Sequence, residues 1–310
     1  MIVEPRPEHL VWLDGKFVRW ADATMHLSAH HYGFGVFEGV RSYVGERGAA
    51  IFRLADHTRR LFRSARMLKL RIPDAFDADC LNRAQLELLR RNQLGDAYLR
   101  PFVFLDGFLG LRPSSRDLSV RVAVLAVAWQ SSDTGQGSRA ARGLTLKTSS
   151  FLRHPPNTLL SKAKANGNYL GGMLALEEAQ SSGADDAVLL DQNGFVTETT
   201  GANLFLVKEG ALFTPPVSSV LDGVTRDTVF TLAKAAGLAV SECPLTRDEL
   251  YVADEAFITG TAAEVSAIAE VDGRPIGTAA VGPITRRLQT MYAAHVRGRG
   301  EGHPEWLTIV

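Results

Sequence analysis

Apolar and polar positions along the first part of the chain predict a mixture of strands and helices. Two short apolar runs flank Asp14-Gly15, a dipeptide typical of the tight turn of a β-hairpin. Further apolar segments predict strands over 35–44, 97–105 and 118–129, and helical spacing predicts helices from Asp56 to Leu68 and over 77–93, the second ending at Gly95. This part is therefore expected to be a small α/β domain.

After residue 129 the pattern stops and then restarts. Residues 130–142 are polar and rich in glycine, which predicts an interdomain linker. Beyond it, a strand is expected over 144–150, helices over 167–183, 224–237 and 282–297, and hairpin turns at Asn193-Gly194, Glu209-Gly210 and Asp272-Gly273. The prediction is an α+β or mixed α/β protein with a small domain over 1–129 and a larger domain over 143–310.

Composition narrows the classes of function. The 310 residues include 34 Lys plus Arg and 34 Asp plus Glu, and this neutrality argues against a nucleic-acid or anionic-membrane partner. A hydrophobic fraction of 45% argues against intrinsic disorder. No apolar run is long enough to span a bilayer, and the N-terminal residues do not resemble a signal peptide. The only two cysteines, Cys80 and Cys243, suit a reducing cytoplasm.

Two short segments are candidate anion cups. Leu221-Asp222-Gly223-Val224-Thr225 is a tight turn that leads into a helix, whose first N–H groups and dipole attract anions. Gly260-Thr261-Ala262-Ala263 follows an apolar strand, and its small residues permit close approach of a ligand. Taken alone, an ordinary N-capped turn and a tight strand-to-strand turn are the simpler explanations of these two segments.

Three polar residues are candidates for chemistry. Lys162 and Lys164 alternate, so on an extended segment both would point to one face, and either could supply an amine nucleophile. Glu198 ends a strand expected to enter the core, where a carboxylate needs a cationic or proton-donating partner. Asn203 follows on the next strand. Solvated lysines and a rim glutamate remain the alternatives.

Two arginines interrupt apolar strands. Arg41 and Arg100 would either pair with a buried acid or face a cleft that receives carboxylates. His30-His31 lacks accompanying ligands at metal spacing, so no metal is expected. Sequence signatures of nucleophile-elbow hydrolases, P-loop proteins and dinucleotide-binding proteins are absent.

In combination, the motifs resemble those of the class IV pyridoxal-phosphate aminotransferases, most closely the branched-chain amino-acid aminotransferases. The segments that carry the resemblance are FEGVRSY (37–43), HTRRL (57–61), KAKANGNY (162–169), ETTGAN (198–203), LDGVTR (221–226) and GTAAE (260–264). They extend over nearly the whole chain. The resemblance implies a fold type IV protomer, similar to D-amino-acid aminotransferase, with a pseudo-barrel as its larger domain.

The resemblance also assigns the cofactor, pyridoxal 5'-phosphate. Lys164 corresponds to the catalytic Schiff-base lysine, and Lys162 is then a neighbour. Glu198 corresponds to the carboxylate on the pyridine nitrogen, and Tyr169 to the tyrosine on the phenolic oxygen. The other cofactor-binding positions implied are Arg60, Val224, Thr225 and Thr261 around the phosphate, Leu221 against the ring, and Asn203.

The substrate positions implied by the resemblance are Tyr32, Phe37, Gly39, Arg41, Tyr98 and Arg100, with Thr261 and Ala262. The turn at Thr261-Ala262 would hold the α-carboxylate, and Arg100 would bind the distal carboxylate of glutamate. An aromatic pocket for leucine beside an arginine for glutamate would explain the use of both substrates.

The expected activity is transamination between a branched-chain or similar hydrophobic L-amino acid and 2-oxoglutarate. A homodimer or higher homo-oligomer is implied, with amino acids and 2-oxo acids as the only other partners. D-amino-acid aminotransferase, (R)-amine transaminase and aminodeoxychorismate lyase share the scaffold and remain alternatives. A cofactor-binding protein without turnover is the alternative from another class.

Overall fold

The computed structural model describes residues 3–31, 33–107, 118–129 and 139–310, which form two compact units. Unit 1 comprises Met1–Ser131, Ala163–Gly167 and His295–Val310, and unit 2 comprises Ser132–Lys162 and Asn168–Ala294. The chain thus passes between units near the expected linker. Two segments expected in the larger domain group instead with unit 1, because each pairs with a strand of that unit.

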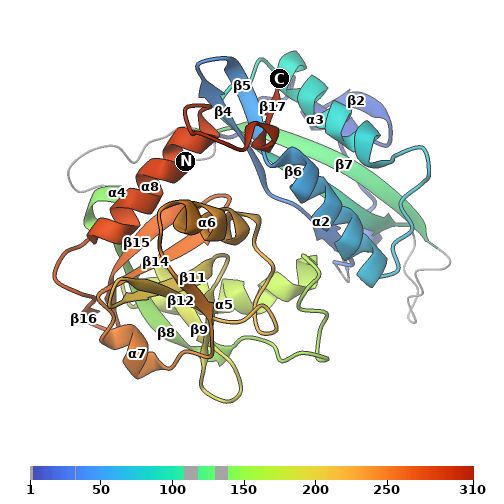
Figure 1. Cartoon of the computed structure of the whole chain (residues 1–310). Coiled ribbons are helices and arrows are strands. Elements are labelled where there is room, and N and C mark those ends of the chain that lie inside the picture. Colours follow the sequence, from blue (N-terminus) through green and yellow to red (C-terminus); the bar gives the residue numbers. More distant parts are fainter. Residues whose placement is uncertain (1–2, 32, 108–117, 130–138) are drawn as a thin grey trace. The chain divides into compact units, whose positions relative to one another are not determined.

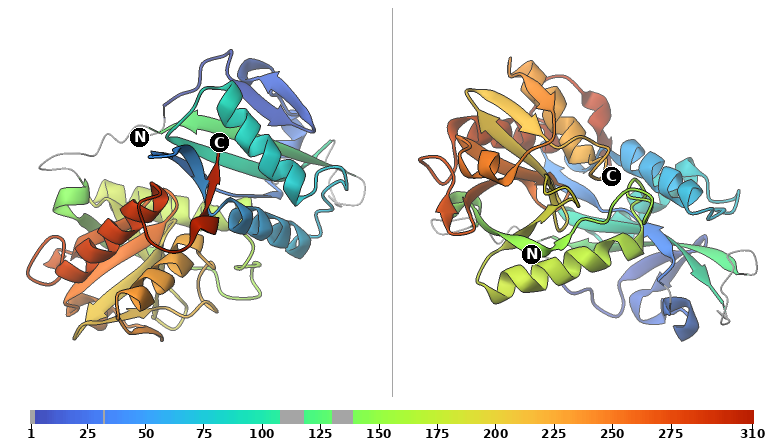
Figure 2. Two further views of the ribbon diagram at one scale, coloured as in Figure 1. Left: turned by 45° about the horizontal axis from the view of Figure 1, so that its top comes forward. Right: turned by 90° about the horizontal axis from the view of Figure 1, so that it is seen from below.

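The described part of unit 1 contains an antiparallel sheet (Figures 1 and 2). Its strands, in spatial order, are β17 (Leu307–Ile309), β5 (Gly48–Phe52), β4 (Val40–Gly45), β6 (Ala97–Asp106), β7 (Ser119–Ala128), β1 (Leu10–Leu13) and β2 (Lys16–Arg19), with β3 (Gly35–Phe37) also paired to β6. The helical elements are α1 (Leu27–His30), α2 (Leu54–Met67), α3 (Ala78–Arg91), η1 (Trp20–Asp22) and η3 (Pro304–Trp306).

The core of unit 1 lies between its sheet and two long helices. The helix α2 packs on β3 and β6, α3 packs on β1 and β7, and the two helices contact each other. The core includes Ile51, Leu61, Leu88 and Leu99, each fully buried. Removing such side chains from water supplies most of the driving force for folding.

Unit 2 contains a mixed sheet that closes on itself within the described residues. In order, its strands are β10 (Val196–Thr199), β9 (Asp186–Leu190), β8 (Leu144–Leu152), β15 (Glu264–Val271), β14 (Glu255–Gly260), β11 (Asn203–Lys208), β12 (Ala211–Thr214) and β13 (Val240–Glu242), with β16 (Arg274–Pro275) on β15. An additional pairing of β10 with β11 makes a ring of the strands from β10 to β11. Ring closure leaves those strands no open edge.

Helices surround this ring of strands. They are α4 (Arg139–Arg142), α5 (Leu170–Ser181) after the turn η2 (Asn166–Tyr169), α6 (Val224–Ala235), α7 (Arg247–Tyr251) and α8 (Pro283–Val296). The helix α5 packs on β8 and β9, and α6 packs on β14. The α+β class is therefore confirmed. Among the described residues, no helix has both the length and the apolar character needed to cross a membrane.

The hairpin turns lie where the sequence predicts them. Asp14-Gly15, Glu209-Gly210 and Asp272-Gly273 each have positive φ at both residues and join paired strands. Such primed turns match the twist of antiparallel strands, which is why these dipeptides predict hairpins. The turn at Asn193-Gly194 joins β9 to β10, with Gly194 at φ +85°.

Two expected elements differ from the structure. The strand expected over 35–44 is two strands, β3 and β4, separated by Glu38-Gly39. At this break the Glu38 carboxylate contacts the buried side chains of His57 and Arg60 on α2. The helix expected over 77–93, before Gly95, spans Ala78–Arg91, and Gln93 adopts the left-handed conformation at φ +53°.

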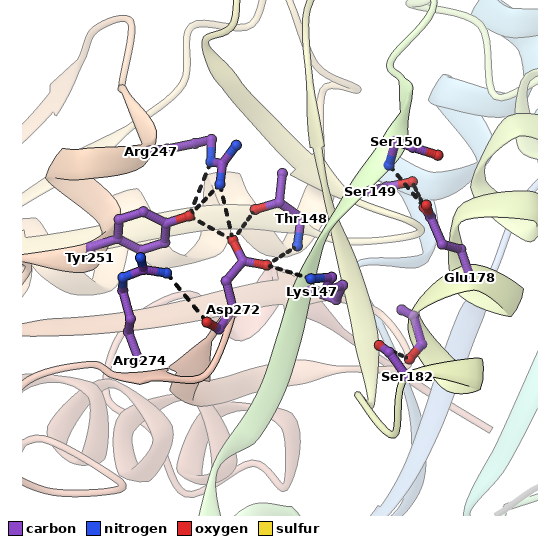
Figure 3. A network of polar contacts seen from close by, with 11 residues as sticks. Lys147, Thr148, Ser149, Ser150, Glu178, Ser182, Arg247, Tyr251, Asp272 and Arg274 are labelled. Atoms are coloured by element: carbon purple, nitrogen blue, oxygen red, sulfur yellow. Dashed lines mark hydrogen bonds and ion pairs between the residues drawn. The ribbon is translucent and has the colours of Figure 1, made fainter.

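The turn after β15 is held by a half-buried acid. Asp272 accepts hydrogen bonds from Thr148 N, Thr148 Oγ1 and Tyr251 Oη at 2.7, 2.6 and 2.7 Å (Figure 3). Burial alone would raise the pKa of Asp272, but the hydrogen bonds outweigh burial, and its pKa is lowered. Asp272 thereby ties β8 and α7 to this hairpin.

Candidate active site

Lys164 lies on a short extended segment that adds to the sheet of unit 1. Its backbone N–H donates to Ser64 Oγ at 3.0 Å, and its carbonyl accepts from the N–H of Phe37 at 3.0 Å. The flanking residues Ala163 and Ala165 are buried in the core of the unit. Because side chains alternate on an extended segment, the lysine points the other way, with Nζ 5.0 Å from the centre of the Phe37 ring.

The expectation that both lysines share one face does not describe their contacts. Lys162 Nζ donates to the carbonyl of Val217, and Lys162 belongs to unit 2. Lys164 belongs to unit 1. Each lysine therefore has its own surroundings, and only Lys164 lies next to side chains singled out for chemistry.

Arg60 is held in a buried cluster with Glu38 and His57. Arg60 Nε and Nη2 donate to the two oxygens of Glu38 at 2.6 and 2.8 Å, and His57 Nδ1 lies 2.8 Å from Glu38 Oε2. The Glu38 residue is 0% exposed. The edge of the guanidinium that carries Nε and Nη2 is thus paired with Glu38.

Electrostatics fixes the charges of this cluster. Burial would raise the pKa of Glu38, but the charge and hydrogen bonds of Arg60 and the hydrogen bond from His57 hold it well below its ordinary value. The pKa of His57 is lowered, first by burial and then by the charges of Arg60 and Lys164, against the opposing effect of Glu38. At neutral pH His57 is uncharged and donates its Nδ1 hydrogen to a charged Glu38.

A cationic and aromatic face lies on β4 and β6. Arg41 pairs in register with Tyr98, and its guanidinium carbon lies 4.4 Å from the Tyr43 ring centre and 4.3 Å from that of Trp129. The Arg100 guanidinium carbon lies 5.6 Å from the ring of Phe37 and 5.3 Å from that of Tyr98. Both guanidinium groups therefore lie over aromatic rings within cation–π distance, an arrangement that can present a guanidinium to a carboxylate.

Gly39 makes room for this face. A Cβ atom at this position would lie 2.0 Å from the hydroxyl oxygen of Tyr98. Any side chain at position 39 would displace Tyr98 from its position. Glycine at this site therefore lets Tyr98 keep its position.

Unit 2 holds Glu198 with three partners. Its Oε1 lies 2.6 Å from Nε of Arg153, and its Oε2 accepts from Asn203 Nδ2 at 3.3 Å and Leu221 N at 3.2 Å. Glu198 is 7% exposed and Arg153 is 8% exposed. The expected cationic partner is thus present as Arg153, and the carboxylate is fixed by contacts to both its oxygens.

Three backbone turns lie around Asn203. Its Nδ2 donates to the carbonyl of Leu221 at 2.9 Å, and a Cβ at Gly223 would lie 2.0 Å from its Oδ1. Across the sheet Asn203 pairs with Thr259, next to Gly260. A Cβ at Gly260 would lie 3.4 Å from that of Ala202. The two candidate anion cups are therefore brought together with the Glu198 hairpin within unit 2.

The N-terminus of α6 is open to an anion. Its first residues are Val224 and Thr225, and no side chain caps the helix. Thr225 is 4% exposed, and Thr261 and Ala262 lie in the turn that joins β14 to β15. Uncapped N–H groups at a helix start, with a hydroxyl beside them, form an anion-binding arrangement.

Tyr169 ends the turn η2, directly before α5. A Cβ at Gly172 would lie 2.8 Å from the carbonyl oxygen of Thr200, so the start of α5 is held against the turn that follows Glu198. Tyr169 is half-buried. Its position follows from the packing of α5, which glycine permits.

The residues present fit pyridoxal phosphate. The cofactor needs donors for a phosphate, an acid for a protonated ring nitrogen and a primary amine. Unit 2 supplies the first two with the uncapped start of α6 and the anchored Glu198, and unit 1 supplies the amine of Lys164. In addition, Thr259 Oγ1 is buried and has no hydrogen-bond partner among the described residues of unit 2.

The candidate residues fall into two sets. Unit 1 brings together Phe37, Gly39, Arg41, Arg60, Tyr98, Arg100 and Lys164, and unit 2 brings together Tyr169, Glu198, Asn203, Leu221, Val224, Thr225, Thr261 and Ala262. Tyr32 lies outside the described residues. Sequence reasoning missed Glu38 and Arg153; an acid in an apolar strand was the available signal for Glu38.

Comparisons with known proteins identify the family of the chain. The family model of amino-transferase class IV matches residues 35–271. A branched-chain-amino-acid aminotransferase of Pseudomonas aeruginosa is 48% identical over 305 residues, covering 97% of each chain.

Solved structures of a T.th. branched-chain amino acid aminotransferase are also similar. The structure with pyridoxamine 5'-phosphate has a TM-score of 0.93 and 41% identity, covering 97% of this chain and 98% of that chain. The structure complexed with N-(5'-phosphopyridoxyl)-L-glutamate has a TM-score of 0.91 and 40% identity at the same coverage. A family match over most of the chain and relatives aligned along nearly all of it show that this protein belongs to the class IV aminotransferases.

Proposed function

We propose that this chain is a pyridoxal-phosphate-dependent aminotransferase that exchanges amino groups between a branched-chain L-amino acid and 2-oxoglutarate. The observation that carries the proposal is the strand face where Arg100 stacks on Phe37 and Tyr98. Aromatic rings suit an aliphatic side chain, and a guanidinium suits the distal carboxylate of the acceptor. The names of the relatives, and the glutamate adduct bound by one of them, support the same pair of substrates.

Several residues would hold the cofactor. Arg60, Thr225 and Thr261 would bind its phosphate together with the N–H groups of Val224 and Thr225, as the α6 terminus suggests. Glu198 would face the ring nitrogen, with Asn203 supporting that carboxylate. Tyr169 would contact the phenolic oxygen, and Leu221 would pack on the ring.

The bound cofactor supplies an electron sink for the pair released when the Cα–H bond breaks. Lys164 Nζ would take the Cα proton as a general base and, as a general acid, would deliver a proton to the cofactor carbon C4′, the 1,3 transfer that transamination requires. Hydrogen bonds of the Lys164 backbone N–H and carbonyl fix the position of its Cα, from which the side chain extends. Fixing the base in this way keeps its amine in position for proton transfer, which reduces the entropic cost of the step.

Glu198 contributes a charge that does not move during the reaction. Arg153, Asn203 and the Leu221 N–H hold its oxygens. A carboxylate already oriented needs no reorganisation when it stabilises a protonated nitrogen. The proposed role of Glu198 is therefore electrostatic and separate from the proton transfer at Lys164.

Substrate binding involves the remaining residues. Thr261 and Ala262 would hold the α-carboxylate, while Tyr32, Phe37, Gly39, Arg41, Tyr98 and Arg100 would line the side-chain pocket. We further propose that the chain forms a homodimer or higher homo-oligomer. We also propose that it is located in the cytoplasm, and the free cysteines Cys80 and Cys243 support this reducing compartment. A small domain over 1–129 and a larger domain over 143–310, joined by 130–142, remain part of the proposal.

A panel of amino donors tests the proposed function. The purified holoenzyme is given L-amino acids, D-amino acids and (R)-amines as donors, with 2-oxoglutarate or pyruvate as acceptor. We expect the highest specificity constants for L-leucine, L-isoleucine and L-valine with 2-oxoglutarate. Preference for D-alanine or an (R)-amine would assign the chain to another activity of the scaffold, and cofactor binding without turnover would refute the proposal.

A further inference from the structure

The C-terminal half of α2 borders a groove with strongly basic walls. The cavity measures about 710 Å³, and its basic lining residues are Arg59, Arg63, Arg66, Lys69 and Arg71. Its apolar lining includes Phe62, Leu70 and Ile72, and no acidic residue belongs to the described lining. The volume lies within the range of about 300–1,000 Å³ that is usual for small-molecule sites. Since the whole chain is formally neutral, this positive charge is a local surplus.

The basic residues are arranged in a row. Arg59, Arg63 and Arg66 follow the spacing i, i+4, i+7, which places them on one face of α2. Like charges at this spacing destabilise a helix. The rise of an α-helix gives the row a length of about 10 Å, too long for one small anion to contact. The arrangement is therefore suited to a ligand with several linked anionic groups.

Acidic partners balance basic residues on neighbouring helical surfaces but not at the end of this row. Glu87 pairs with Arg91 at 2.7 Å on α3, and Asp56 pairs with Arg59 at 2.6 Å at the start of α2. For Arg66 and Lys69 the described residues provide no acidic partner. Their charges remain available to a ligand, although the helix C-terminus also favours positive charge there.

Lys69 occupies a backbone conformation that favours glycine. Its φ is +56°, and the hydrogen bonds Lys69 N to Arg66 O and Leu70 N to Ala65 O close the helix end. Glycine fills the corresponding position after α5 and α6, whereas Gln93 fills it after α3. A lysine there costs conformational free energy relative to glycine. The sequence thus places a positive charge beside the groove despite a local cost.

We propose that this groove binds a nucleotide-type ligand, in which linked phosphates meet Arg63, Arg66 and Lys69. The apolar or aromatic part of the ligand would rest on Phe62 and Ile72, which are half-buried, whereas Leu70 lies in the core at 4% exposure. The mixed lining favours such a ligand over an inorganic anion, because a purely ionic occupant would leave the apolar wall uncovered. This binding site is separate from the residues proposed for transamination, so neither proposal depends on the other.

Titration calorimetry on the dialysed holoenzyme at low ionic strength tests the site. The probes are adenosine triphosphate, inorganic tripolyphosphate and adenosine, and the cofactor absorbance is followed in parallel. We expect adenosine triphosphate to bind most tightly, tripolyphosphate more weakly and adenosine not measurably, with unchanged cofactor absorbance. Binding should weaken as salt is added, because exposed charges are screened.

Two variants locate the binding. Lys69→Gly removes a charge and suits the backbone at φ +56°, so we expect about fivefold weaker binding with no fall in Tm. The double variant Arg66→Glu/Lys69→Glu should abolish binding. The control Arg286→Glu/Arg287→Glu reverses two exposed charges on α8 and should leave binding unchanged.

Four results would overturn the proposal. The first is that adenosine triphosphate does not bind at millimolar concentration. The second is that the Arg66→Glu/Lys69→Glu and Arg286→Glu/Arg287→Glu variants lose the same amount of affinity for adenosine triphosphate. The third is a change in cofactor absorbance that parallels binding, which would place the nucleotide at the cofactor residues. The fourth is equal affinity for tripolyphosphate and adenosine triphosphate, which would remove the role of the apolar wall.

Discussion

Removing the charge of Glu38 should be more damaging than removing both charges of its pair with Arg60. In Glu38→Gln, Arg60 stays buried at 7% exposure without its counter-ion. Breaking a buried pair from one side costs about 3–5 kcal/mol. Replacing both partners, as in Glu38→Leu/Arg60→Met, removes the stranded charge and leaves mainly the His57 N–H without its acceptor, at a cost of about 1–3 kcal/mol.

Thermal unfolding of the apoenzyme, followed by calorimetry, compares the variants without any contribution from bound cofactor. For a unit of this size, each kcal/mol lost from the free energy of unfolding lowers Tm by about 2–4 °C. Glu38→Gln should therefore lower Tm by roughly 6–20 °C, and the double variant should lower it by roughly 2–12 °C. Glu87→Gln removes a carboxylate from an exposed pair with Arg91 and serves as the control, with Tm almost unchanged. A double variant less stable than Glu38→Gln would refute this reasoning.

The pH dependence gives a second test of Glu38. Because its pKa is lowered in the folded protein, Glu38 contributes stability above its unfolded pKa of about 4.3. That contribution is lost as the pH falls below this value towards the folded pKa. The Tm difference between the parent and Glu38→Gln should therefore shrink on acidification below about pH 4. A difference that stays constant from pH 7 to pH 3 would contradict the assignment.

Four further predictions concern the proposed site and the fold. Lys164→Ala should abolish both transamination and borohydride trapping of the cofactor while Lys162→Ala retains both, and peptide mapping of the trapped protein checks this assignment. Glu198→Gln should lower kcat with little change in cofactor retention on dialysis, because an amide carries no charge to stabilise the ring nitrogen. Arg100→Met should reduce kcat/KM about 10- to 100-fold for 2-oxoglutarate and far less for the leucine keto acid, and equal losses would contradict a substrate-binding role. Asp272→Asn should lower Tm at neutral pH, and this difference should shrink as the pH falls below about 3.9, since the pKa of Asp272 is lowered on folding.

Local features of the fold could be predicted because they depend on neighbouring residues. Asp14-Gly15 and Glu209-Gly210 form hairpins since both residues of each turn accept positive φ. The end of α6 before Gly237 follows from the same conformational freedom. The lengths of the helices were harder to predict. The helix α3 ends at Arg91 because Gln93 adopts a left-handed conformation, for which glutamine gives no strong signal in the sequence.

Partners distant in sequence could not be predicted from the pattern alone. The sequence shows Arg60 and Glu198 as candidates, yet nothing in their surroundings points to Glu38 or Arg153 as the residues that fix them. Those pairs exist because β3 packs beside α2 and because β9 pairs with β8 on one side and with β10 on the other. Register and packing, which bring such segments together, are properties of the whole sheet.

The segment Ala163–Gly167 shows how residues that are close in sequence can belong to different structural units. Lys164 and Tyr169 are near neighbours in the chain, but Lys164 is tied to Phe37 and Ser64 in unit 1, whereas Tyr169 precedes α5 in unit 2. The short segment is held by a strand-like bridge at Val36 and by two buried alanines. Its backbone hydrogen bonds, more than the lysine side chain, decide to which unit the amine belongs. A substitution at Ala163 or Ala165 that is too large for the core should therefore displace Lys164 without touching its chemistry.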